Sequence, residues 1–527
     1  MIQQIKNKNR QLNSNLFWGM LYVVLMIGIM FACIFLSTRI IYANKNEYFI
    51  LNFFSLIIGV SLFIIIYYII YLLKIKKKDS LMIILSIILT FLLFFLARNY
   101  SFKTGWDSKG IIESAQLIAN NEYEVLESTY FSMYPNNIFI TKLFSIAFRL
   151  AKLTRISDGY NYILLLNCCI YSWTGFFIYK IACYLFENRN IPFMAWIIYI
   201  FLIGLSPWVI VPYSDSLALG VVTLETFLFL SVIKNKERKK RIRYITLLLL
   251  ISVFGYYIKP QNIIFLIAIG IITILAFIEK REYHNREKLK DTFLYFIIAL
   301  ITIFMSIYIV NYFINNGGYN RNREMKFGMS HFLMMGWNEQ SGGLWNSEDV
   351  HFSLSFDNCN ERNKANYQKF KMRIKNMKLK GVIKQIVKKT LTNYNDGTFA
   401  YGKEGYFYLE DYETGNKQLR GFLGNIYKEQ GKYYGLFRQI MQILWITILF
   451  FNIFSYSKDE KIIVLQLSII GLTLFEILFE ARARYLFAYA PIYIVLACAG
   501  FKNVIQLLKK TKIYLSNNKV YMEKRKQ

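Results

Sequence analysis

Residues 50–98 read ILNFFSLIIGVSLFIIIYYIIYLLKIKKKDSLMIILSIILTFLLFFLAR, two long apolar runs separated by a basic tract at residues 74–78. Each run is long enough to cross the roughly 30 Å hydrocarbon core of a bilayer as an α-helix. Similar runs recur between short charged segments along the chain. They predict about twelve membrane spans, at residues 16–36, 50–73, 81–96, 160–185, 191–211, 216–233, 244–258, 263–278, 292–313, 440–454, 462–479 and 485–507.

The composition favours the same class of protein. Hydrophobic residues make up 55% of the 527-residue chain and aromatic residues 18%, more apolar surface than one soluble core of this size can bury. We therefore expect an all-α polytopic membrane protein. The net charge of +30 would suggest nucleic acid in a soluble protein, but much of it lies in short tracts between apolar runs. No isolated basic domain is visible, so we predict no nucleic-acid partner.

The short basic tracts predict the orientation of the spans, because cytoplasmic loops carry an excess of Lys and Arg. If successive spans cross the membrane in opposite directions, starting from a cytoplasmic N-terminus, every basic tract and both termini lie in the cytoplasm. The tracts are residues 6–10, 74–78, 187–190, 234–243, 279–290, 457–461 and the lysine-rich C-terminal end. The segments left outside are residues 98–160, 212–215, 259–262, 315–439 and 480–484. We expect a protein of the bacterial cytoplasmic membrane whose larger polar segments face outside.

Two apolar segments lie outside the spans. Residues 137–150 are too short to cross, and a crossing there would move later basic tracts outside, so we expect a re-entrant or interfacial helix. In the large loop, residues 379–387 predict an amphipathic basic helix, which lies either on anionic headgroups or on the loop's own core. The chain thus divides into N-terminal spans at 1–97, a first outer loop at 98–159, a central bundle at 160–314, a large extracytoplasmic loop at 315–439, and C-terminal spans with a basic tail at 440–527.

The first outer loop carries the candidate for catalysis. It opens NYSFKTGWD at residues 99–107, so Asp107 lies just beyond a span. A carboxylate at that height can deprotonate an acceptor hydroxyl while a donor's lipid tail stays in the membrane. The alternative for Asp107 is a helix cap or a solvated loop carboxylate. Candidates for substrate binding in the same loop are Glu113, Tyr134 and Asn136.

Two further polar residues interrupt apolar sequence at the outer ends of spans. Asp215 lies in PYSDS at residues 212–216, where it either caps the following helix or binds substrate. Lys259 lies in YYIKPQN at residues 256–262. A cation at that position can hold an anionic phosphate, and the alternative is a side chain that snorkels to the headgroups.

Late in the chain, charged residues cluster in FEILFEARARYL at residues 475–486. Ionisable groups at a membrane edge usually pair or line a polar cavity. Arginine is suited to bidentate recognition of phosphate, which makes Arg482 and Arg484 candidates for substrate binding. A structural pair of Glu480 with Arg484 would also satisfy both groups.

The large outer loop is rich in Gly, Asn and Trp between residues 328 and 350. This composition resembles a carbohydrate-contacting loop, in which aromatic faces meet sugar rings and amides meet hydroxyls. The candidates for substrate binding there are His331, Asn338 and Asp349. A lone histidine such as His331 is more often structural than catalytic.

Taken in order, these motifs resemble the GT-C superfamily of lipid-linked-sugar glycosyltransferases, related distantly to protein O-mannosyltransferases and to the aminoarabinose transferases of lipid A. The resemblance covers roughly residues 81–507 and rests on GWD, YPNN, PYSD, IKP and EARARYL. It implies that Asp107 takes the position of the family's catalytic first-loop acid. Lys259, Arg482 and Arg484 then become donor-phosphate residues. Asp107 lacks the adjacent second acid of the mannosyltransferases, which leaves the role of Glu113 open.

The resemblance implies transfer of a sugar from a polyprenyl-phosphate donor to a glycan, lipid or protein acceptor in the cell envelope. Polyprenyl phosphate is already a good leaving group, so we predict no metal and no cofactor. A polymerase or ligase of surface polysaccharide is the second hypothesis, although such enzymes usually lack an acidic first-loop motif. A flippase for lipid-linked oligosaccharides is the third. A flippase should carry charges along a mid-membrane path, whereas here, Glu225 and Glu476 apart, charges concentrate at the membrane edges.

Overall fold

The computed structural model describes residues 2–74, 79–155, 158–280, 286–405, 407–411 and 415–524. Within these ranges the chain forms helices α1 to α19, several short 3-10 and π turns, and one pair of two-residue strands. The predicted all-α polytopic class is therefore confirmed. The predicted basic tract at residues 74–78 lies outside the described residues except for Lys74, and so do residues 281–285 and 525–527.

Among the described residues, helices long and apolar enough to cross a membrane correspond to ten of the predicted spans. They are α1 (Ile2–Phe31), α2 (Asn52–Leu73), α3 (Asp79–Tyr100), α7 (Tyr160–Leu185), α9 (Ser214–Lys234), α10 (Arg238–Ile258), α12 (Arg286–Asn315), α17 (Tyr434–Ile453), α18 (Glu460–Leu478) and α19 (Ala490–Lys524). The other two predicted spans form the shorter apolar helices α8 (Asn190–Tyr199) and α11 (Ile263–Lys280).

The predicted span at residues 191–211 is not one continuous helix. After α8 the backbone widens into a π turn at Ile200–Gly204, and a 3-10 turn follows at Pro207–Ile210. Proline has no backbone N–H and cannot continue an α-helical ladder. The side chain of Ser206 instead accepts a hydrogen bond from the backbone N–H of Trp208 at 3.4 Å, which starts the 3-10 turn.

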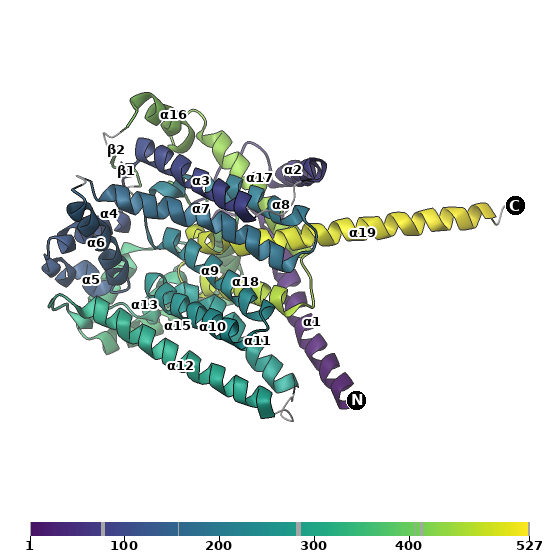
Figure 1. Cartoon of the computed structure of the whole chain (residues 1–527). Helices are drawn as coiled ribbons and strands as arrows, with labels where there is room; N and C mark the ends of the chain where they lie inside the picture. Colours follow the sequence, from purple (N-terminus) through teal and green to yellow (C-terminus); the bar gives the residue numbers. More distant parts are fainter. Residues whose placement is uncertain are drawn as a thin grey trace.

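The bundle has two distinct ends (Figure 1). One end carries α4 (Asp107–Ala119), α5 (Thr129–Met133), α6 (Asn137–Leu153) and α13 (Met329–Gly336), and we call it the loop end. Both chain termini lie at the opposite end, the terminal end. The segment predicted as a re-entrant or interfacial helix forms α6, which packs on α4 at the loop end.

The loop end also holds most of the large loop. Its helices are α14 (Ser347–Leu354), α15 (Cys359–Tyr394) and α16 (Lys417–Tyr427). The strands β1 (Phe102–Lys103) and β2 (Glu410–Asp411) pair antiparallel, with Phe102 opposite Asp411, and connect the two loops. The segment predicted as an amphipathic helix is helical and forms the second part of α15, which follows a break in helical geometry at Lys378 (φ 52°). Its faces differ from those predicted, because Leu379 and Ile383 are exposed while Lys389 is buried.

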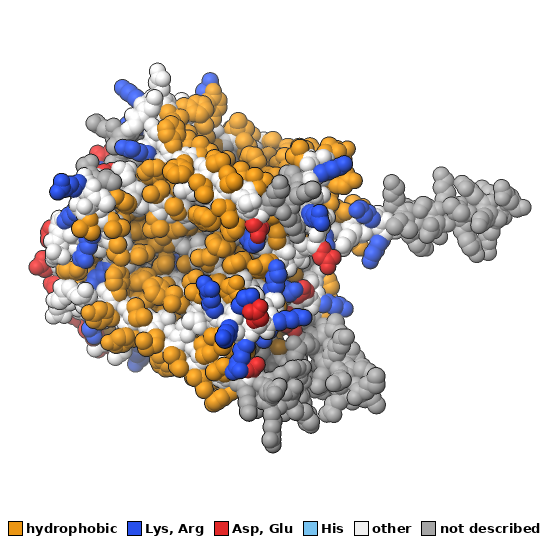
Figure 2. Space-filling model, in the orientation of Figure 1, with side chains coloured by type: hydrophobic (Ala, Val, Ile, Leu, Met, Phe, Trp, Pro, Cys, Tyr) orange, Lys and Arg blue, Asp and Glu red, His pale blue; other side chains and the backbone are white. Residues whose placement is uncertain are grey.

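Apolar side chains cover much of the bundle's outer surface. Figure 2 shows hydrophobic residues across the middle of one face, with Lys and Arg gathered towards its sides. The apolar stretches of α2 and α12 are only 17% and 11% buried within the protein. Exposed apolar surface on this scale marks a membrane-contacting region, and a helix can lie in lipid because its backbone groups bond to one another.

Two buried lysines attach the loop-end helices to the ends of spans. Lys142 of α6 donates to backbone carbonyls at the end of α12, including that of Ile314 at 2.6 Å. Lys389 of α15 donates to the carbonyls of Gly336 at 2.9 Å, Ile477 at 2.7 Å and Phe479 at 2.5 Å. The last carbonyls of a helix lack partners and carry partial negative charge, so a cation there satisfies them. Lys389 thereby fixes the chain where α18 ends.

Candidate functional site

Five segments that are far apart in sequence meet at the loop end. They are the start of α4, the start of α9, the residue before the 3-10 turn η5 (Pro260–Asn262), the loop between α15 and α16, and the chain from the end of α18 into the 3-10 helix η7 (Ala483–Tyr489). Each of the five segments predicted to lie outside therefore contributes to this meeting point. The polar groups they bring together form what we call the charged cluster: Asp107, Asp215, Lys259, Glu404, Glu480, Arg482 and Arg484.

Asp215 is the buried centre of the charged cluster, with 2% of its side chain exposed. One carboxylate oxygen accepts from the ammonium of Lys259, and the other accepts from Nη1 of Arg484 at 2.9 Å. The alternative in which Asp215 caps α9 is wrong, because the N-terminal flanking residue is Tyr213 and no side-chain capping bond is made. A buried carboxylate is strongly unfavourable without partners, and two cations supply them here.

Lys259 is buried as well and does not snorkel away from the bundle. Its ammonium contacts Asp215 and lies 4.2 Å from the centre of the Tyr485 ring. Burial lowers the pKa of Lys259 below its ordinary value, although Asp215 opposes the shift. The snorkelling interpretation is therefore wrong for this structure, and Lys259 belongs to the charged cluster.

Arg484 joins the charged cluster to a group of aromatic rings. The centre of its guanidinium lies 5.0 Å from the Trp106 ring, 5.3 Å from the Tyr485 ring and 5.4 Å from the Tyr213 ring. Its Nε atom is 3.0 Å from Oε1 of Glu404. Guanidinium groups over aromatic faces gain electrostatic stabilisation, most strongly where water is excluded.

Arg482 bridges two carboxylates. Its Nη1 donates to Glu404 at 2.9 Å and its Nε donates to Glu480 at 2.9 Å. The alternative of a structural pair between Glu480 and Arg484 is wrong, because Glu480 pairs with Arg482 and Arg484 pairs with Asp215. The other Glu480 oxygen instead accepts from the hydroxyl of Tyr485 at 2.8 Å. Burial would raise the pKa of Glu480, but Arg482 and Arg484 hold it below its ordinary value, so Glu480 is ionised.

Asp107 opens α4 at the edge of the charged cluster. Its side chain makes no capping hydrogen bond, since the flanking residue of the helix is Trp106. Oδ2 accepts from the hydroxyl of Tyr213 at 3.2 Å. Burial raises the pKa of Asp107 above its ordinary value, while Arg484 and Tyr213 act in the opposite direction. A carboxyl group in this setting holds a proton more readily than a solvated aspartate does.

Glu404 is the member that sequence reasoning missed. It comes from the loop between α15 and α16 and has one oxygen against each of two arginines. Its local sequence, YGKEG at residues 401–405, shows no catalytic or binding motif. Trp106 and Tyr213, by contrast, lie beside predicted acids in GWD and PYSD. With Glu404 included, the charged cluster contains four carboxylates and three cations, so each cation already has an anionic partner.

Of the three other predicted residues of the first outer loop, Glu113 and Asn136 lie apart from the charged cluster. Tyr134 lies near it, and burial together with the charges of Asp107 and Glu480 raises the pKa of Tyr134. Glu113 is exposed and pairs with Lys109, one turn earlier on α4, at 3.7 Å. Asn136 is exposed and donates to the side chain of Asn137 at 3.0 Å. Tyr134 packs edge-on against Phe327, with ring centres 5.4 Å apart. Of these candidates, Glu113 lines a separate cavity on the far face of α4.

The predicted residues of the large loop hold that loop's own helices together. His331 is buried, stacks on Phe327 and bonds through Nδ1 to the hydroxyl of Ser353 at 2.7 Å. Burial lowers the pKa of His331 to about 4, so its ring is neutral at ordinary pH. Asp349 accepts from Asn338 at 2.9 Å and from Arg373 at 2.6 and 3.1 Å. These bonds connect α13, α14 and α15, so in this structure the residues hold the helices of the large loop together.

Comparison with known proteins gives a family and one distant structural likeness. No curated protein matches the sequence. Among solved structures, the fold is similar to that of the apo crystal structure of ArnT from Cupriavidus metallidurans, with a TM-score of 0.31 and 10% identity over 79% of this chain and 76% of that chain. Residues 5–505 match a family described as a conserved hypothetical integral membrane protein. This match spans nearly the whole bundle together with its loop end, and the chain therefore belongs to that family of integral membrane proteins.

Proposed function

We propose that the protein is a membrane-embedded glycosyltransferase that moves a sugar from a polyprenyl-phosphate donor to a hydroxyl of a cell-envelope acceptor. One observation carries the proposal. A largely buried carboxyl group, Asp107, lies beside the guanidinium of Arg484 where an apolar bundle meets its polar loops. Such a position suits a reaction between a lipid-tailed donor and a water-soluble acceptor.

Asp107 serves as the general base in this scheme. Burial raises its pKa above the usual value of aspartate, which makes its carboxylate a stronger base. The hydroxyl of Tyr213 fixes the orientation of the carboxylate. The rings of Trp106 and Tyr213 meet edge to face, 4.7 Å apart between centres, and a sugar would pack beside them.

Arg484, Arg482 and Lys259 serve as the donor-phosphate residues. Each is already paired with a carboxylate, so phosphate oxygens would share these cations with Asp215 or Glu404. Sharing is feasible for arginine, because a guanidinium carries five N–H donors in a planar fork. A phosphodiester with one negative charge fits such a site better than a dianion, because the carboxylates of the charged cluster outnumber its cations.

The reaction balances with the groups present. The acceptor hydroxyl gives its proton to Asp107, and its oxygen forms a bond to the anomeric carbon of the donor sugar. The bond from that carbon to the phosphate oxygen breaks, and the polyprenyl phosphate leaves with the electron pair. Arg484 and its neighbours then stabilise the charge that develops on the phosphate.

We also propose that the loop end faces the outside of a bacterial cytoplasmic membrane. The segments predicted outside meet in the charged cluster, and the termini lie together at the terminal end. The separation of these segments from the termini supports the orientation of the spans that was predicted from the basic tracts. A donor whose carrier has already been turned to the outer leaflet would then meet the charged cluster directly.

Mass spectrometry of cell-envelope glycans tests the function. A strain that lacks the gene should lose one sugar substituent, the wild-type gene should restore it, and Asp107→Asn should not. Glu124→Gln, which changes an exposed carboxylate of the same loop, is the matched control and should restore it fully. An unchanged glycan profile in the deletion strain, or full restoration by Asp107→Asn, would remove the transferase proposal.

A further inference from the structure

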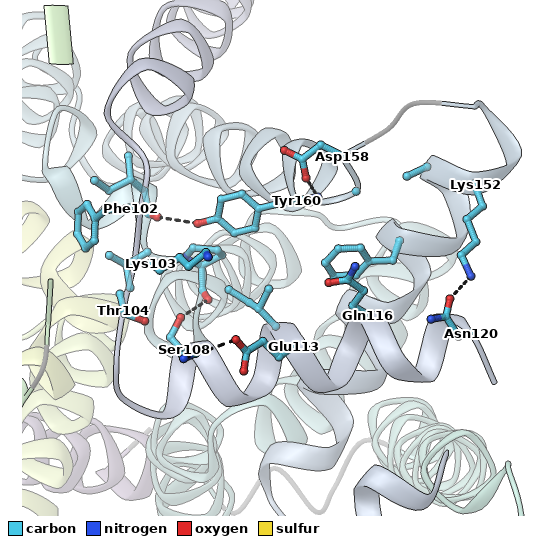
Figure 3. Close-up of a pocket in the computed structure, with 18 residues that line it drawn as sticks. Phe102, Lys103, Thr104, Ser108, Glu113, Gln116, Asn120, Lys152, Asp158 and Tyr160 are labelled. Carbon is cyan, nitrogen blue, oxygen red and sulfur yellow. Dashed lines mark hydrogen bonds and ion pairs between the residues drawn. The ribbon is translucent and has the colours of Figure 1, made fainter. Parts of the chain in front are cut away.

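A cavity with polar and apolar walls lies on the face of α4 that points away from the charged cluster. Its volume is about 360 Å³, and its walls come from α4, the end of α6, the start of α7 and residues 210–212 (Figure 3). This volume is within the range of about 300–1,000 Å³ in which proteins hold small molecules. The charged cluster and the donor scheme make no use of it.

The geometry of α4 separates the cavity from the catalytic candidate. Ser108, Ile112, Gln116 and Asn120 all line the cavity, and residues four apart share one face of an α-helix. Asp107 does not line it and faces Tyr213 on the opposite side. One helix therefore forms a wall of both sites, and its first turn is where they approach each other.

Charges around the cavity balance each other. Lys109 lies 3.7 Å from Glu113, and Lys103, at the rim, pairs with Glu410 outside the cavity. Lys152 and Asp158 add one charge of each sign. The residues that line the cavity include no arginine, whose guanidinium fork could share its donors between a carboxylate and a phosphate. The balanced wall instead fits a neutral ligand.

Hydrogen-bonding groups and apolar surface alternate in the cavity. Gln116 and Asn120 present amides, which both donate and accept, beside the ammonium and carboxylate groups. Lys152 donates to the side chain of Asn120 and to the carbonyl of Ala119 at 3.1 Å, which fixes that end of the wall. Phe148 and Tyr160 supply aromatic surface. This combination suits a ring that carries hydroxyls at its edge and C–H groups on its face.

We propose that this cavity is a second sugar subsite, which holds one neutral ring of the acceptor while another ring of the same acceptor presents its hydroxyl to Asp107 around the first turn of α4. The acceptor is then an oligosaccharide or polysaccharide, not a single sugar or a protein side chain. This assignment of the acceptor rests on the proposed function. The binding of a neutral sugar in the cavity does not.

Ligand-observed NMR tests the binding without any transfer reaction. The full-length protein is placed in phosphatidylcholine nanodiscs, because the sugar headgroups of common detergents would compete for the cavity. Saturation-transfer difference spectra are recorded with glucose, galactose, mannose and N-acetylglucosamine at millimolar concentration. We expect signals from at least one of them with the wild-type protein.

Two variants of neighbouring residues locate the signal. Gln116→Trp places a large ring inside the cavity, while Leu117→Trp adds the same ring on an exposed position of α4 that does not line it. We expect Gln116→Trp to abolish the sugar signals and Leu117→Trp to keep them. Absence of signals from the wild-type protein with all four sugars, or equal signals from both variants, overturns the proposal.

Transfer assays separate this proposal from the proposed function. If both hold, Gln116→Trp should raise KM for an oligosaccharide acceptor by tenfold or more while KM for the lipid donor stays unchanged. Sugar binding in the cavity together with an inactive protein would uphold the subsite and defeat the transferase. If the protein transfers sugar and Gln116→Trp leaves that transfer unchanged, the transferase is upheld and the subsite is defeated.

Discussion

Arg484 donates through Nη1 to Oδ2 of Asp215 at 2.9 Å, joining two residues that are 269 positions apart in the chain. Asp215 opens α9, and Arg484 lies in the 3-10 helix that precedes α19. Both side chains are almost fully buried. The pair fixes the C-terminal spans against the central bundle and places the guanidinium beside Asp107.

Replacement of Asp107 by Asn removes the proposed base and keeps its size. We expect turnover to fall by about 10²–10⁴-fold, the usual contribution of a general base. KM for the lipid donor should change little, because the arginines remain in place. Single-turnover assays with a radiolabelled donor measure both quantities. Activity near that of the wild type in a correctly folded Asp107→Asn protein would exclude Asp107 as the base.

The pH dependence of the reaction reports the environment of Asp107. The base acts when deprotonated, so kcat/KM should rise with pH through the pKa of Asp107, which burial places above the ordinary value of aspartate. Tyr213→Phe removes a hydrogen bond to the charged form. The rise of kcat/KM with pH should then shift to higher pH by about one unit, since a hydrogen bond to a charged group contributes about 1.5–3 kcal/mol. A rise that stays in place in Tyr213→Phe contradicts the assignment.

Glu404→Gln tests whether phosphate shares the arginines with this carboxylate. The change removes one negative charge next to Arg482 and Arg484 but keeps the shape of the side chain. We expect KM for the lipid donor to fall about fivefold, which corresponds to roughly 1 kcal/mol for one screened charge. Steady-state kinetics at varied donor concentration measures the change. An increased or unchanged donor KM would mean that Glu404 only holds the arginines in place.

Lys389→Met tests the connection between α15 and the end of α18. Its ammonium donates hydrogen bonds to three backbone carbonyls, which have few other donors within reach because they are buried. We expect a loss of about 3 kcal/mol or more of stability, because unsatisfied buried carbonyls cost about 1–3 kcal/mol each. Lys384→Met on the exposed face of the same helix is the control and should change little. Thermal unfolding in nanodiscs compares the two, and equal midpoints would show that Lys389 does not hold the helices together.

Labelling of single cysteines tests the orientation of the bundle. In a Cys359→Ser background, cysteines placed at the exposed positions Glu122 and Ser347 should react with an impermeant maleimide in intact cells. A cysteine at Lys236, which is exposed at the terminal end, should react only after lysis. Labelling at Lys236 alone in intact cells would invert the topology.

The spans could be predicted from sequence because the signal is local. An apolar run longer than the bilayer core demands a helix wherever it occurs. Asp107 could be proposed as a candidate for a similar reason, since its position just beyond a span is visible in the chain itself. The alternative pair of Glu480 with Arg484 would need these residues, four apart, to lie side by side as they do in a helix. Around Arg482 the backbone is extended (φ −153°, ψ 122°), and residues two apart share a side of an extended chain, so Glu480 meets Arg482.

The rest of the charged cluster depends on contacts that no local pattern encodes. Lys259 lies 44 positions from Asp215, and Arg482 lies 78 positions from Glu404. Periodicity and spacing describe neighbours within an element, not partners brought together by packing of the spans. A capping role for Asp215 was the sensible local expectation, and buried ion pairing from other helices displaced it.

The separation of Asp215 from its partners also sets an order of events during synthesis. A chain enters the membrane from its N-terminal end, so Asp215 arrives long before Arg484 has been translated. During that interval Lys259, the nearer partner in sequence, is the cation available to neutralise it. The α9–α10 hairpin can therefore insert with its buried acid already paired. Arg484 completes the pairing only when η7 has been translated, so a nascent chain truncated before η7 carries an unfinished site.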